Sequence, residues 1–422
     1  MHTTAKKVMT TVISMVLITG LAVVAAPAQA AKTTITYFSF SASPDHIKTL
    51  NSIVAAFEKA NPTIHVKVEN AAYADYFTKL KTRIAANQAP DTFELDYQDF
   101  ISYAAAGSLL NLGAVSTKDK TFNKSLYFGK AYDVFALNGK QYGLPSSYST
   151  VVLFYNKDLF NAAGVATPTS SWDWSDEAAA DKALAAKLPA GTYADFQPVQ
   201  FWEFYKVLAQ AGGQFLSANK KTALFNKQPG IDALNWLVSK QNNGWKPTAA
   251  QMGTMDDGAM FAAGKLAMWH SGIWMFDGLK TAPFKWDVAV EPGGVTPGNH
   301  FFANDVSVSS KTKNADAAWK WAKFLTSDAA SVKLMISSSW EIPATSGKAP
   351  LAGYLNSPNP PANRQAVFDA LKNPVAPPVI RQQNQMQDVV NAWLAKAQDG
   401  SVSVVDALNG AAAEVNAILA KE

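Results

Sequence analysis

Cysteine is absent from the 422 residues of this sequence. Its absence excludes disulfide bonds, thiolate zinc sites and cysteine nucleophiles together. It also excludes the lipid-modified cysteine by which many exported proteins are anchored. An exported form of this chain would therefore be free rather than tethered by lipid.

The sequence also has only a small excess of charge of one sign. Lysine and arginine number 37 and aspartate and glutamate 33, which gives a formal net charge of +4. The sequence has no basic stripe and no polybasic patch, so neither nucleic acid nor an anionic membrane surface is an expected partner. It also lacks the H-E-x-x-H, Walker and G-x-G-x-x-G motifs. We expect no metal and no other cofactor.

The first thirty residues have the pattern of a signal peptide. Lys6 and Lys7 are followed by an apolar run from Val12 to Ala26, and the small-x-small sequence ends at Ala30. We predict cleavage after about Ala30 and a location outside the cytoplasm, in the periplasm or at the cell exterior. The alternative is a permanent membrane anchor, for which a run of about fifteen residues is short. Removal of this segment makes the chain less positive by two charges.

After this segment, strand and helix patterns alternate. Apolar residues recur at helical spacing between short β-branched and aromatic runs, and Ser43-Pro44 forms a helix start. This βαβαβ order predicts a mostly parallel sheet, at whose carboxyl edge ligands usually bind. The predicted strands cover 34–38, 64–68 and 92–95, and the helices between them cover 47–57 and 76–84.

Two loops should meet at that edge, because they follow the first and third strands. Residues 38–41 include Phe40, which either faces a ligand or packs in the core. Residues 96–99 include Asp96 and Tyr97. A carboxylate in such a loop can accept hydrogen bonds from ligand hydroxyls, so we predict that Asp96 binds ligand.

The stretch from Gly139 to Phe160 changes character in its middle. Gly143 and the residues around Pro145 are typical of a turn, whereas Val151 to Tyr155 form the continuous apolar run of a strand covered on both faces. A mature chain of about 390 residues is too long for one ordinary core. We therefore interpret this stretch as a crossing between two lobes. Tyr148 becomes a candidate for the cleft floor, with core packing as the alternative.

Segments spread along the chain resemble, in this order, the extracellular solute-binding proteins of carbohydrate ABC transporters, family 1, of the maltose- and multiple-sugar-binding type. Each motif is weak alone, but the joint order is specific and covers nearly the whole mature chain. The segments are FEKANPTIHVKVE, DYFTKLKTRIAANQAPDTFELD, AAAGSLLNL, GKQYGLP, FYNKDLFNAAGV and AAGKLAMWHSGIW, with AWKWAKFLTSDAA and IPATS further on.

The resemblance implies a two-lobed α/β fold of the periplasmic-binding-protein type (type II), with a sugar held between the lobes and no catalysis. We expect each lobe to contain a mostly parallel sheet flanked by helices. The first lobe should comprise residues 31–145 and 288–345, and the second residues 146–287 and 346–422. The last helices, which include 389–393 and 408–419, are expected only to pack.

Aromatic residues are concentrated where the second lobe is expected. Eight of the twelve tryptophans lie between residues 172 and 286. Aromatic planes cover the C–H face of a sugar ring, while polar groups pair with its hydroxyls. Trp202 resembles the family's stacking aromatic, with Glu203 beside it as a possible hydroxyl acceptor. Trp274 follows a predicted strand and Gly272, and the alternative is that it caps its own helix.

Three further ligand-binding residues are predicted. Asp305 lies near the start of a strand that should return to the first lobe. Trp340 either closes the sugar site from the first-lobe side or packs in the core. Arg381 follows a proline-rich return, where the family often has cleft residues.

The predicted function is capture of a sugar by closure of two lobes, followed by delivery to the membrane permease of an ABC importer whose ATPase subunits are separate chains. A malto- or raffinose-type oligosaccharide is the first choice and a monosaccharide the second, and the protein is expected to be a monomer. One alternative is a secreted carbohydrate-binding adhesin or accessory module, which predicts little closure. The other is a glycoside hydrolase that uses carboxylates among Asp96, Glu203 and Asp305.

Overall fold

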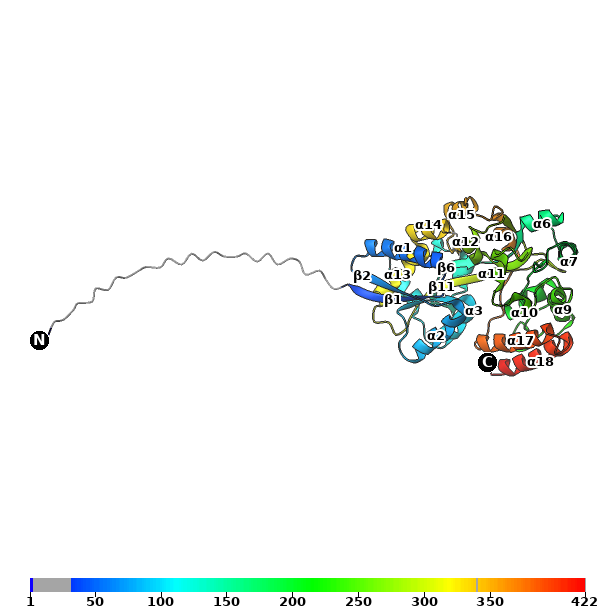
Figure 1. The fold of residues 1–422 in the computed structure, drawn as a ribbon. Helices are drawn as coiled ribbons and strands as arrows, with labels where there is room; N and C mark the ends of the chain where they lie inside the picture. The colour runs from blue at the N-terminus through cyan, green and yellow to red at the C-terminus, as the bar shows by residue number, and fades with distance from the viewer. Residues whose placement is uncertain (3–31, 339–340, 422) are drawn as a thin grey trace.

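The computed structural model describes residues 1–2, 32–338 and 341–421. The predicted signal peptide beyond its first two residues, and Trp340, lie outside the described residues. Figure 1 shows two bodies side by side. One contains β1, β2, β6 and β11, and the other contains α6, α7, α9, α17 and α18. The two-lobed α/β fold is confirmed.

The first lobe is built on a six-stranded sheet of order β12-β6-β11-β3-β1-β2. β1 pairs in parallel with both β2 and β3, as the βαβαβ pattern predicts. β11 runs antiparallel to β3 and β6, and β12 runs antiparallel to β6. The mostly parallel sheet expected for this lobe therefore holds only for β1, β2 and β3, because the other three of its five strand pairs are antiparallel. The strands are β1 (Thr33–Ser39), β2 (Ile64–Asn70), β3 (Thr92–Asp96), β6 (Gly143–Ser149), β11 (Phe302–Val308) and β12 (Ile342–Pro343).

Helices cover both faces of this sheet (Figure 1). On one face, Trp321 of α13 is fully buried, and its ring centroid lies 5.5 Å from that of Tyr37 and 5.2 Å from that of Phe57. On the other face, Tyr76 of α2 packs against Phe38. The predicted start of α1 is confirmed, because the Ser43 side chain accepts a hydrogen bond from the backbone N–H of His46. The helices are α1 (Pro44–Ala60), α13 (Ala315–Ser327) and α14 (Ala329–Ser337) on the first face, and α2 (Tyr73–Ala85) and α3 (Tyr97–Ala105) on the second.

The chain passes from the six-stranded sheet to a second sheet at Thr150, which is the single residue between β6 and β7 (Val151–Asn156). The turn predicted around Pro145 is wrong, because these residues lie within β6 and are buried. Pro145 is next to an irregularity in the pairing of β6 with β11. Proline has no backbone donor for the ladder, so such a site tolerates it.

The second sheet has the order β8-β7-β9, and both of its pairs are antiparallel. The mostly parallel sheet expected for this lobe is therefore wrong. The apolar run of β7 correctly indicates burial, since all six of its residues are buried. Burial on both faces, however, does not specify the direction of the neighbouring strands. The partners are β8 (Met268–Gly272) and β9 (Trp286–Ala289).

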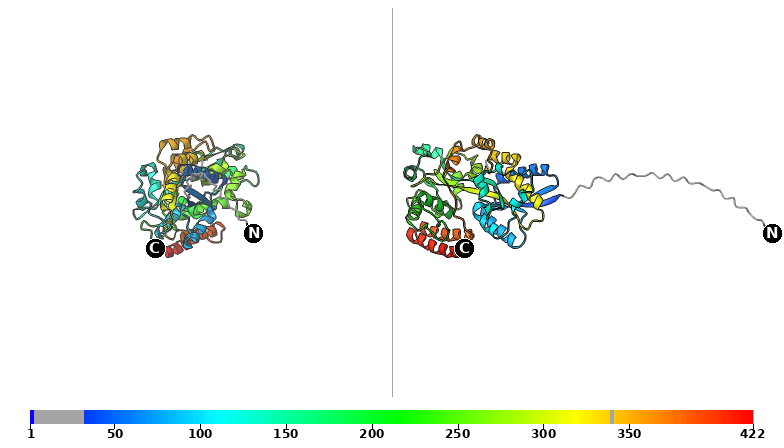
Figure 2. Two further views of the ribbon diagram at one scale, coloured as in Figure 1. Left: turned by 90° about the vertical axis from the view of Figure 1, so that its left-hand side faces the viewer. Right: turned by 180° about the vertical axis from the view of Figure 1, so that it is seen from behind.

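A helical layer completes the second lobe around a core shared by α8, α9, α17 and α18. Figure 2 shows in its rear view that the last two helices, in red, lie at the opposite end from the first strands, in blue. The longer helices here are α7 (Trp174–Ala185), α8 (Phe201–Gln210), α9 (Gln228–Asn242), α17 (Gln383–Gln398) and α18 (Val404–Leu419). Shorter elements are α4 (Leu112–Ser116), α5 (Gly129–Asp133), α6 (Lys157–Ala163), α10 (Ala249–Met252), α11 (Asp257–Ala262), α12 (Phe276–Leu279), α15 (Lys348–Leu355), α16 (Gln365–Ala370), β4 (Ala136–Leu137), β5 (Lys140–Gln141), β10 (Asn299–His300), β13 (Pro374–Val375) and the 3₁₀ turns η1 (Lys124–Leu126) and η2 (Ile273–Met275).

Candidate ligand-binding cleft

A cavity of about 650 Å³ lies between elements of the two lobes. Its first-lobe wall comes from the loop after β1, the starts of α1 and α2, the direct junction of β3 with α3, the ends of β6 and β11 nearest the second sheet, and Glu341 before β12. Its second-lobe wall comes from α8, η2, α12 and α17. The loop predicted at residues 96–99 is wrong, because α3 begins at Tyr97. The first wall contains Phe40, Ser41, Ala42, Ser43, His46, Tyr73, Asp96, Gln98, Ser149, Phe302, Asn304 and Glu341, and the second contains Gln200, Trp202, Trp274, Met275, Asp277, Gly278, Gln387 and Asn391.

Four of the predicted ligand-binding residues meet in this cleft. Phe40 and Asp96 line it from the first lobe, and Trp202 and Trp274 line it from the second. They come from four separate segments, and the first and last of them, Phe40 and Trp274, are more than 200 residues apart in the sequence. The structure therefore brings together an aromatic and a carboxylate from one lobe with two indole rings from the other.

Five other predicted residues do not line the cleft. Tyr148 is buried, with its ring centroid 5.0 Å from that of Phe128, and burial raises its pKa to about 12. Tyr97 is partly buried against a hydrophobic core cluster, and Arg381 is exposed. Glu203 and Asp305 are fully buried. Contact with ligand stays a prediction for these five, as it does for Trp340.

Asp305 has partners inside the sheet. Its Oδ1 accepts from the backbone N–H of Leu95 at 3.1 Å and its Oδ2 from the Ser307 hydroxyl at 2.8 Å. A Cβ on Gly143 would lie only 1.6 Å from the Asp305 carboxylate, so glycine is required on the neighbouring strand. The carboxylate thus fills a space within the sheet.

Trp274 owes its position to Gly272. A Cβ at residue 272 would lie 2.1 Å from the indole ring, so glycine makes room for the ring to fold back over the end of β8. The space beside this glycine is therefore filled by the tryptophan ring itself. Trp274 is partly buried and remains open to the cleft.

Aromatic rings form a continuous wall at the crossing between the lobes. The Phe302 ring lies 5.9 Å from the Trp274 ring and stacks on His300 at 5.1 Å between centroids. The His300 ring in turn lies 5.3 Å from that of Trp202, and its Nε2 is 2.7 Å from the Trp202 carbonyl oxygen. His300 is in β10, which pairs with β13, and Phe302 is in β11 of the six-stranded sheet, so these rings join strands of two different sheets.

Asp96 ends β3 and caps α3. Its Oδ1 accepts from the backbone N–H of Asp99 at 2.8 Å, and its Oδ2 accepts from the Tyr73 hydroxyl at 2.6 Å. Burial raises the pKa of Asp96, and these hydrogen bonds oppose that rise by favouring the charged form.

A second carboxylate, Glu341, lies on the first-lobe wall. It accepts hydrogen bonds from the Ser147 hydroxyl and, at 2.8 Å, from the Asn304 side-chain amide, and burial raises its pKa. None of the described residues that line the cleft is a lysine or an arginine. The lining combines aromatic faces with carboxylates and amides, which suits a ligand that donates hydrogen bonds and carries no negative charge.

The sequence interpretation missed several lining residues. Tyr73 begins a helix whose apolar face was assigned from other positions, so it carried no signal of its own. Gln387 and Asn391 are on α17, which was expected only to pack, and this expectation is wrong. Their spacing of four residues puts both on one helix face, and this polar pair was the available signal. Asn391 also accepts a hydrogen bond from the backbone N–H of Phe201 at the start of α8.

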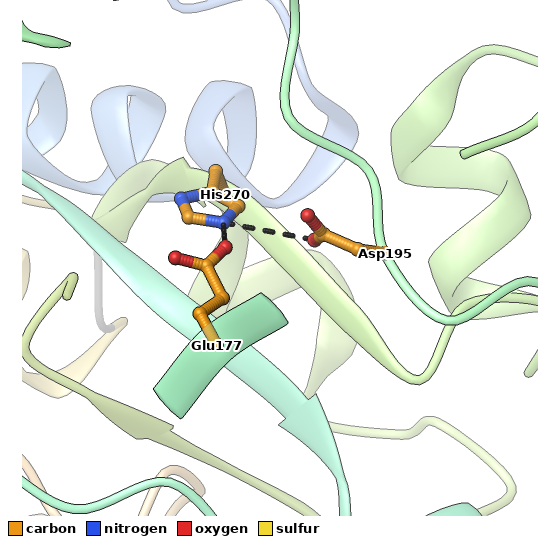
Figure 3. A group of neighbouring side chains, drawn as sticks. All are labelled: Glu177, Asp195 and His270. Carbon is orange, nitrogen blue, oxygen red and sulfur yellow. Dashed lines mark hydrogen bonds and ion pairs between the residues drawn. The ribbon is translucent and has the colours of Figure 1, made fainter. Parts of the chain in front are cut away.

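A cluster of buried charges lies within the second lobe, and its members are not among the residues that line the cleft. Figure 3 shows Glu177, Asp195 and His270 with their side chains pointing toward one another. The His270 Nε2 lies 2.8 Å from Glu177 and its Nδ1 lies 2.7 Å from Glu291. Burial and the Lys240 ammonium disfavour protonation of His270, but the carboxylates outweigh them and raise its pKa to about 10.

Two groups in this cluster have donor atoms close enough to hold a metal ion. They are Glu177, Asp195 and His270, and Glu203, His270 and Glu291. In the first, the Lys240 ammonium contacts both carboxylates. In the second, the Lys206 ammonium lies 2.7 Å from Glu203 and 3.0 Å from Glu291. These ammonium groups already supply the positive charge that a metal would bring.

Two lobes with a shared cleft are typical of solute-binding proteins, although enzymes also have this arrangement. The chain belongs to the family described as bacterial extracellular solute-binding protein, which matches residues 43–332. The predicted family is therefore confirmed, and it is a family of binding proteins.

Similar proteins agree with this assignment. A putative binding protein of Brucella abortus is 26% identical over 425 residues, which cover 96% of this chain and 98% of that protein. The multiple sugar-binding protein of Streptococcus mutans is 28% identical, over 70% of this chain and 71% of that one. An ABC substrate-binding protein of Listeria monocytogenes, solved in complex with cycloalternan, is 41% identical with a TM-score of 0.89, and the match covers 92% and 99% of the two chains.

The fold recurs at lower identity. The cyclic alpha-maltosyl-1,6-maltose binding protein of Arthrobacter globiformis is 23% identical with a TM-score of 0.73, and the match covers 93% of this chain and all of that one. Across the described parts of the chain, we find no helix long and apolar enough to cross a membrane.

Proposed function

We propose that this protein binds a neutral oligosaccharide outside the cytoplasm and delivers it to the permease of an ABC importer. The observation that carries the proposal is the cleft. It joins Trp202 and Trp274 of one lobe to Phe40 and the carboxylates of the other. Aromatic faces suit the C–H faces of sugar rings, and carboxylate and amide oxygens suit the hydroxyls.

Two observations support the ligand class: the charge of the cleft lining and the ligands named for similar proteins. An anionic ligand such as a sugar phosphate would need a cationic clamp, and the described lining has no lysine or arginine. The Listeria protein at 41% identity was solved with cycloalternan, and the Streptococcus protein is named for multiple sugars. These names favour an oligosaccharide, cyclic or linear, over a monosaccharide.

Binding without catalysis is part of the proposal. A glycoside hydrolase needs two carboxyl groups that flank one bond. Of the three carboxylates considered for that role, only Asp96 lines the cleft, while Glu203 and Asp305 are buried among other partners. The other two carboxylates of the lining already have protein partners: Glu341 accepts from Ser147 and Asn304, and Asp277 accepts from Lys280. Appearance of new reducing ends when the protein is incubated with oligosaccharides would contradict this part.

The strands suggest where the lobes join. We assign the first crossing to Thr150, between β6 and β7, and the second to Phe301, between β10 and β11. The third lies between α15, which packs on α14, and α16, which packs on β7 and β9. Export by a signal peptide cleaved after about Ala30, and a monomeric state, complete the proposal.

The test is a thermal-shift screen of the purified mature protein against cycloalternan, maltotriose, raffinose and glucose. A ligand that binds only the folded state at 100 times its Kd stabilises it by about 2.7 kcal/mol, which raises the melting temperature. We expect at least one oligosaccharide to do so, and Trp274→Ala to remove most of that rise. Stabilisation by none of the sugars, or an unchanged rise in the variant, would contradict the proposal.

A further inference from the structure

Tyr73 is an unusual residue on the first-lobe wall. Its exposed fraction is 52%, and it is the one exposed large apolar side chain, among those in the described residues, that lines the cleft. Two edge-to-face contacts hold its ring in place, with centroids 5.4 Å from those of both Phe40 and Phe77. Keeping an aromatic ring exposed forgoes the stabilisation of burial, so an exposed ring that is also held rigid points to a contact.

Asp96 supplies the third constraint on Tyr73. The Tyr73 hydroxyl donates to Asp96 Oδ2 at 2.6 Å, within the range of a charge-assisted hydrogen bond. The other oxygen of Asp96 accepts from the backbone N–H of Asp99, and Asp96 itself is 93% buried. Both oxygens therefore already have donors within the protein, which limits what this carboxylate can offer to a ligand.

We propose that Tyr73 is a ligand-contacting residue that presents its ring to the C–H face of a sugar, and that Asp96 is a positioning residue that acts through it. The ring would be the first-lobe counterpart of Trp202 and Trp274, so that a sugar between them touches aromatic planes from both lobes. This inference rests on the proposed function, and it replaces direct hydroxyl binding as the main role of Asp96.

The arrangement also determines what the contact selects. An aromatic plane recognises a flat, neutral face rather than a charge. A ring fixed at three points loses little freedom on binding, which reduces the entropic cost of the contact. Tyr73 would therefore favour pyranose rings, whose C–H groups lie on one face, over ligands with charged or acyclic ends.

The test is a double-mutant cycle on the mature protein. Tyr73→Phe removes the hydroxyl and keeps the ring. Asp96→Ser keeps a capping hydroxyl for α3 but is too short to hold Tyr73 in place. Calorimetric titration uses whichever of cycloalternan, maltotriose or raffinose binds the wild type most tightly. Tyr73→Ala is included to remove the ring, and Tyr142→Phe is the matched control for loss of a tyrosine hydroxyl outside the cleft.

We expect Tyr73→Ala to weaken binding at least tenfold, and Tyr73→Phe and Asp96→Ser to weaken it several-fold each. The double variant should bind the sugar no more weakly than the weaker-binding of these two single variants, because both single changes remove the same Tyr73–Asp96 hydrogen bond. Losses that multiply in the double variant would show that Asp96 acts independently of Tyr73. Binding by Tyr73→Ala equal to that of Tyr142→Phe would overturn the contact. Melting curves confirm that each variant is folded.

A measurement without ligand separates this inference from the proposed function. In spectra of protein with ¹³C-labelled tyrosine, the Tyr73 signals are assigned from the Tyr73→Phe variant. We expect Asp96→Ser to shift or broaden them, and unchanged signals would overturn the positioning role. If the wild type binds none of the three sugars, the proposed function and the ligand contact of Tyr73 both fail, and the positioning role is judged by the spectra alone.

Discussion

Among single residues, Glu94 has a carboxyl group far from its ordinary state. It is buried in β3, where its Oε2 accepts from the Ser39 hydroxyl at 2.8 Å and the backbone N–H of Phe40 at 3.2 Å. Burial raises its pKa from 4.5 to about 8 despite these donors. The folded state therefore keeps a proton that the unfolded chain releases near pH 4.5.

The raised pKa of Glu94 makes the stability of the folded state depend on pH. Between pH 4.5 and about 8 the folded state binds more protons than the unfolded one, so stability falls as pH rises through that window. A shift of this size corresponds to several kcal/mol. We expect Glu94→Gln, which resembles the protonated side chain, to remove that fall. The urea midpoints of the wild type and of Glu94→Gln are measured at pH 5 and pH 8. A difference in stability, wild type minus variant, that does not become smaller from pH 5 to pH 8 would contradict this expectation.

His270 also makes the stability depend on pH, and it does so in both proteins of that experiment. Its pKa is raised to about 10, so the stability it contributes is complete below about pH 6.5 and is lost as pH rises toward 10. Wild type and Glu94→Gln share this loss. The difference between them below pH 8 thus isolates Glu94.

Between secondary-structure elements, Lys240 of α9 is the most informative link. Its ammonium contacts Glu177 of α7 and also Asp195, and all three are buried. Removing one partner from a buried ion pair leaves an uncompensated charge, which typically costs about 3–5 kcal/mol. We expect Lys240→Met to lower the free energy of unfolding by that amount in urea titrations. Lys221→Met, at an exposed lysine, is the control and should cost little. Equal effects of the two would mean that the cluster does not join the helices.

Sequence periodicity predicted the positions of helices and strands better than it predicted which strands pair and in which direction. The βαβαβ pattern gives β1, β2, β3 and their helices, because burial on a sheet or helix has a local period. Strand direction in the second sheet was not predictable in this way. β7 pairs with β8 and β9, which begin more than 100 residues later, and an apolar run carries no information on which way a distant partner runs.

The site was predictable in part for a related reason. Trp202, Trp274 and Asp96 follow loops or strand ends, and such positions can be recognised locally. Asp305 has the same local signature, but its partners include the backbone of Leu95, 210 residues away. Glu203 likewise meets Glu291 through Lys206. A carboxylate near a strand end can face either ligand or protein, and its neighbours in the folded chain determine which.

At the scale of the whole molecule, an ion pair joins the two lobes at the cleft. Asp45, in the first turn of α1, accepts from the Lys280 ammonium at 3.2 Å, and Lys280 also contacts Asp277 of α12 at 2.7 Å. Because Asp277 and Lys280 belong to the same lobe, only the bond to Asp45 crosses between lobes. If the lobes close on a ligand, this bond exists in the closed state and is absent from the open one.

We expect Asp45→Asn to favour the open form. The pair is partly exposed, at 49% and 32% for the two side chains, so its contribution is about 0.2–1 kcal/mol. Affinity should then fall by up to about fivefold, with the wild-type advantage shrinking as salt screens the pair. Asp75→Asn breaks a pair with Lys79 within α2 and is the control. Small-angle scattering with a sugar below saturation measures the closed fraction. Identical scattering and affinity in the two variants would mean that the Asp45–Lys280 pair does not stabilise the closed form, since both variants lose one surface ion pair but only Asp45→Asn loses one between lobes.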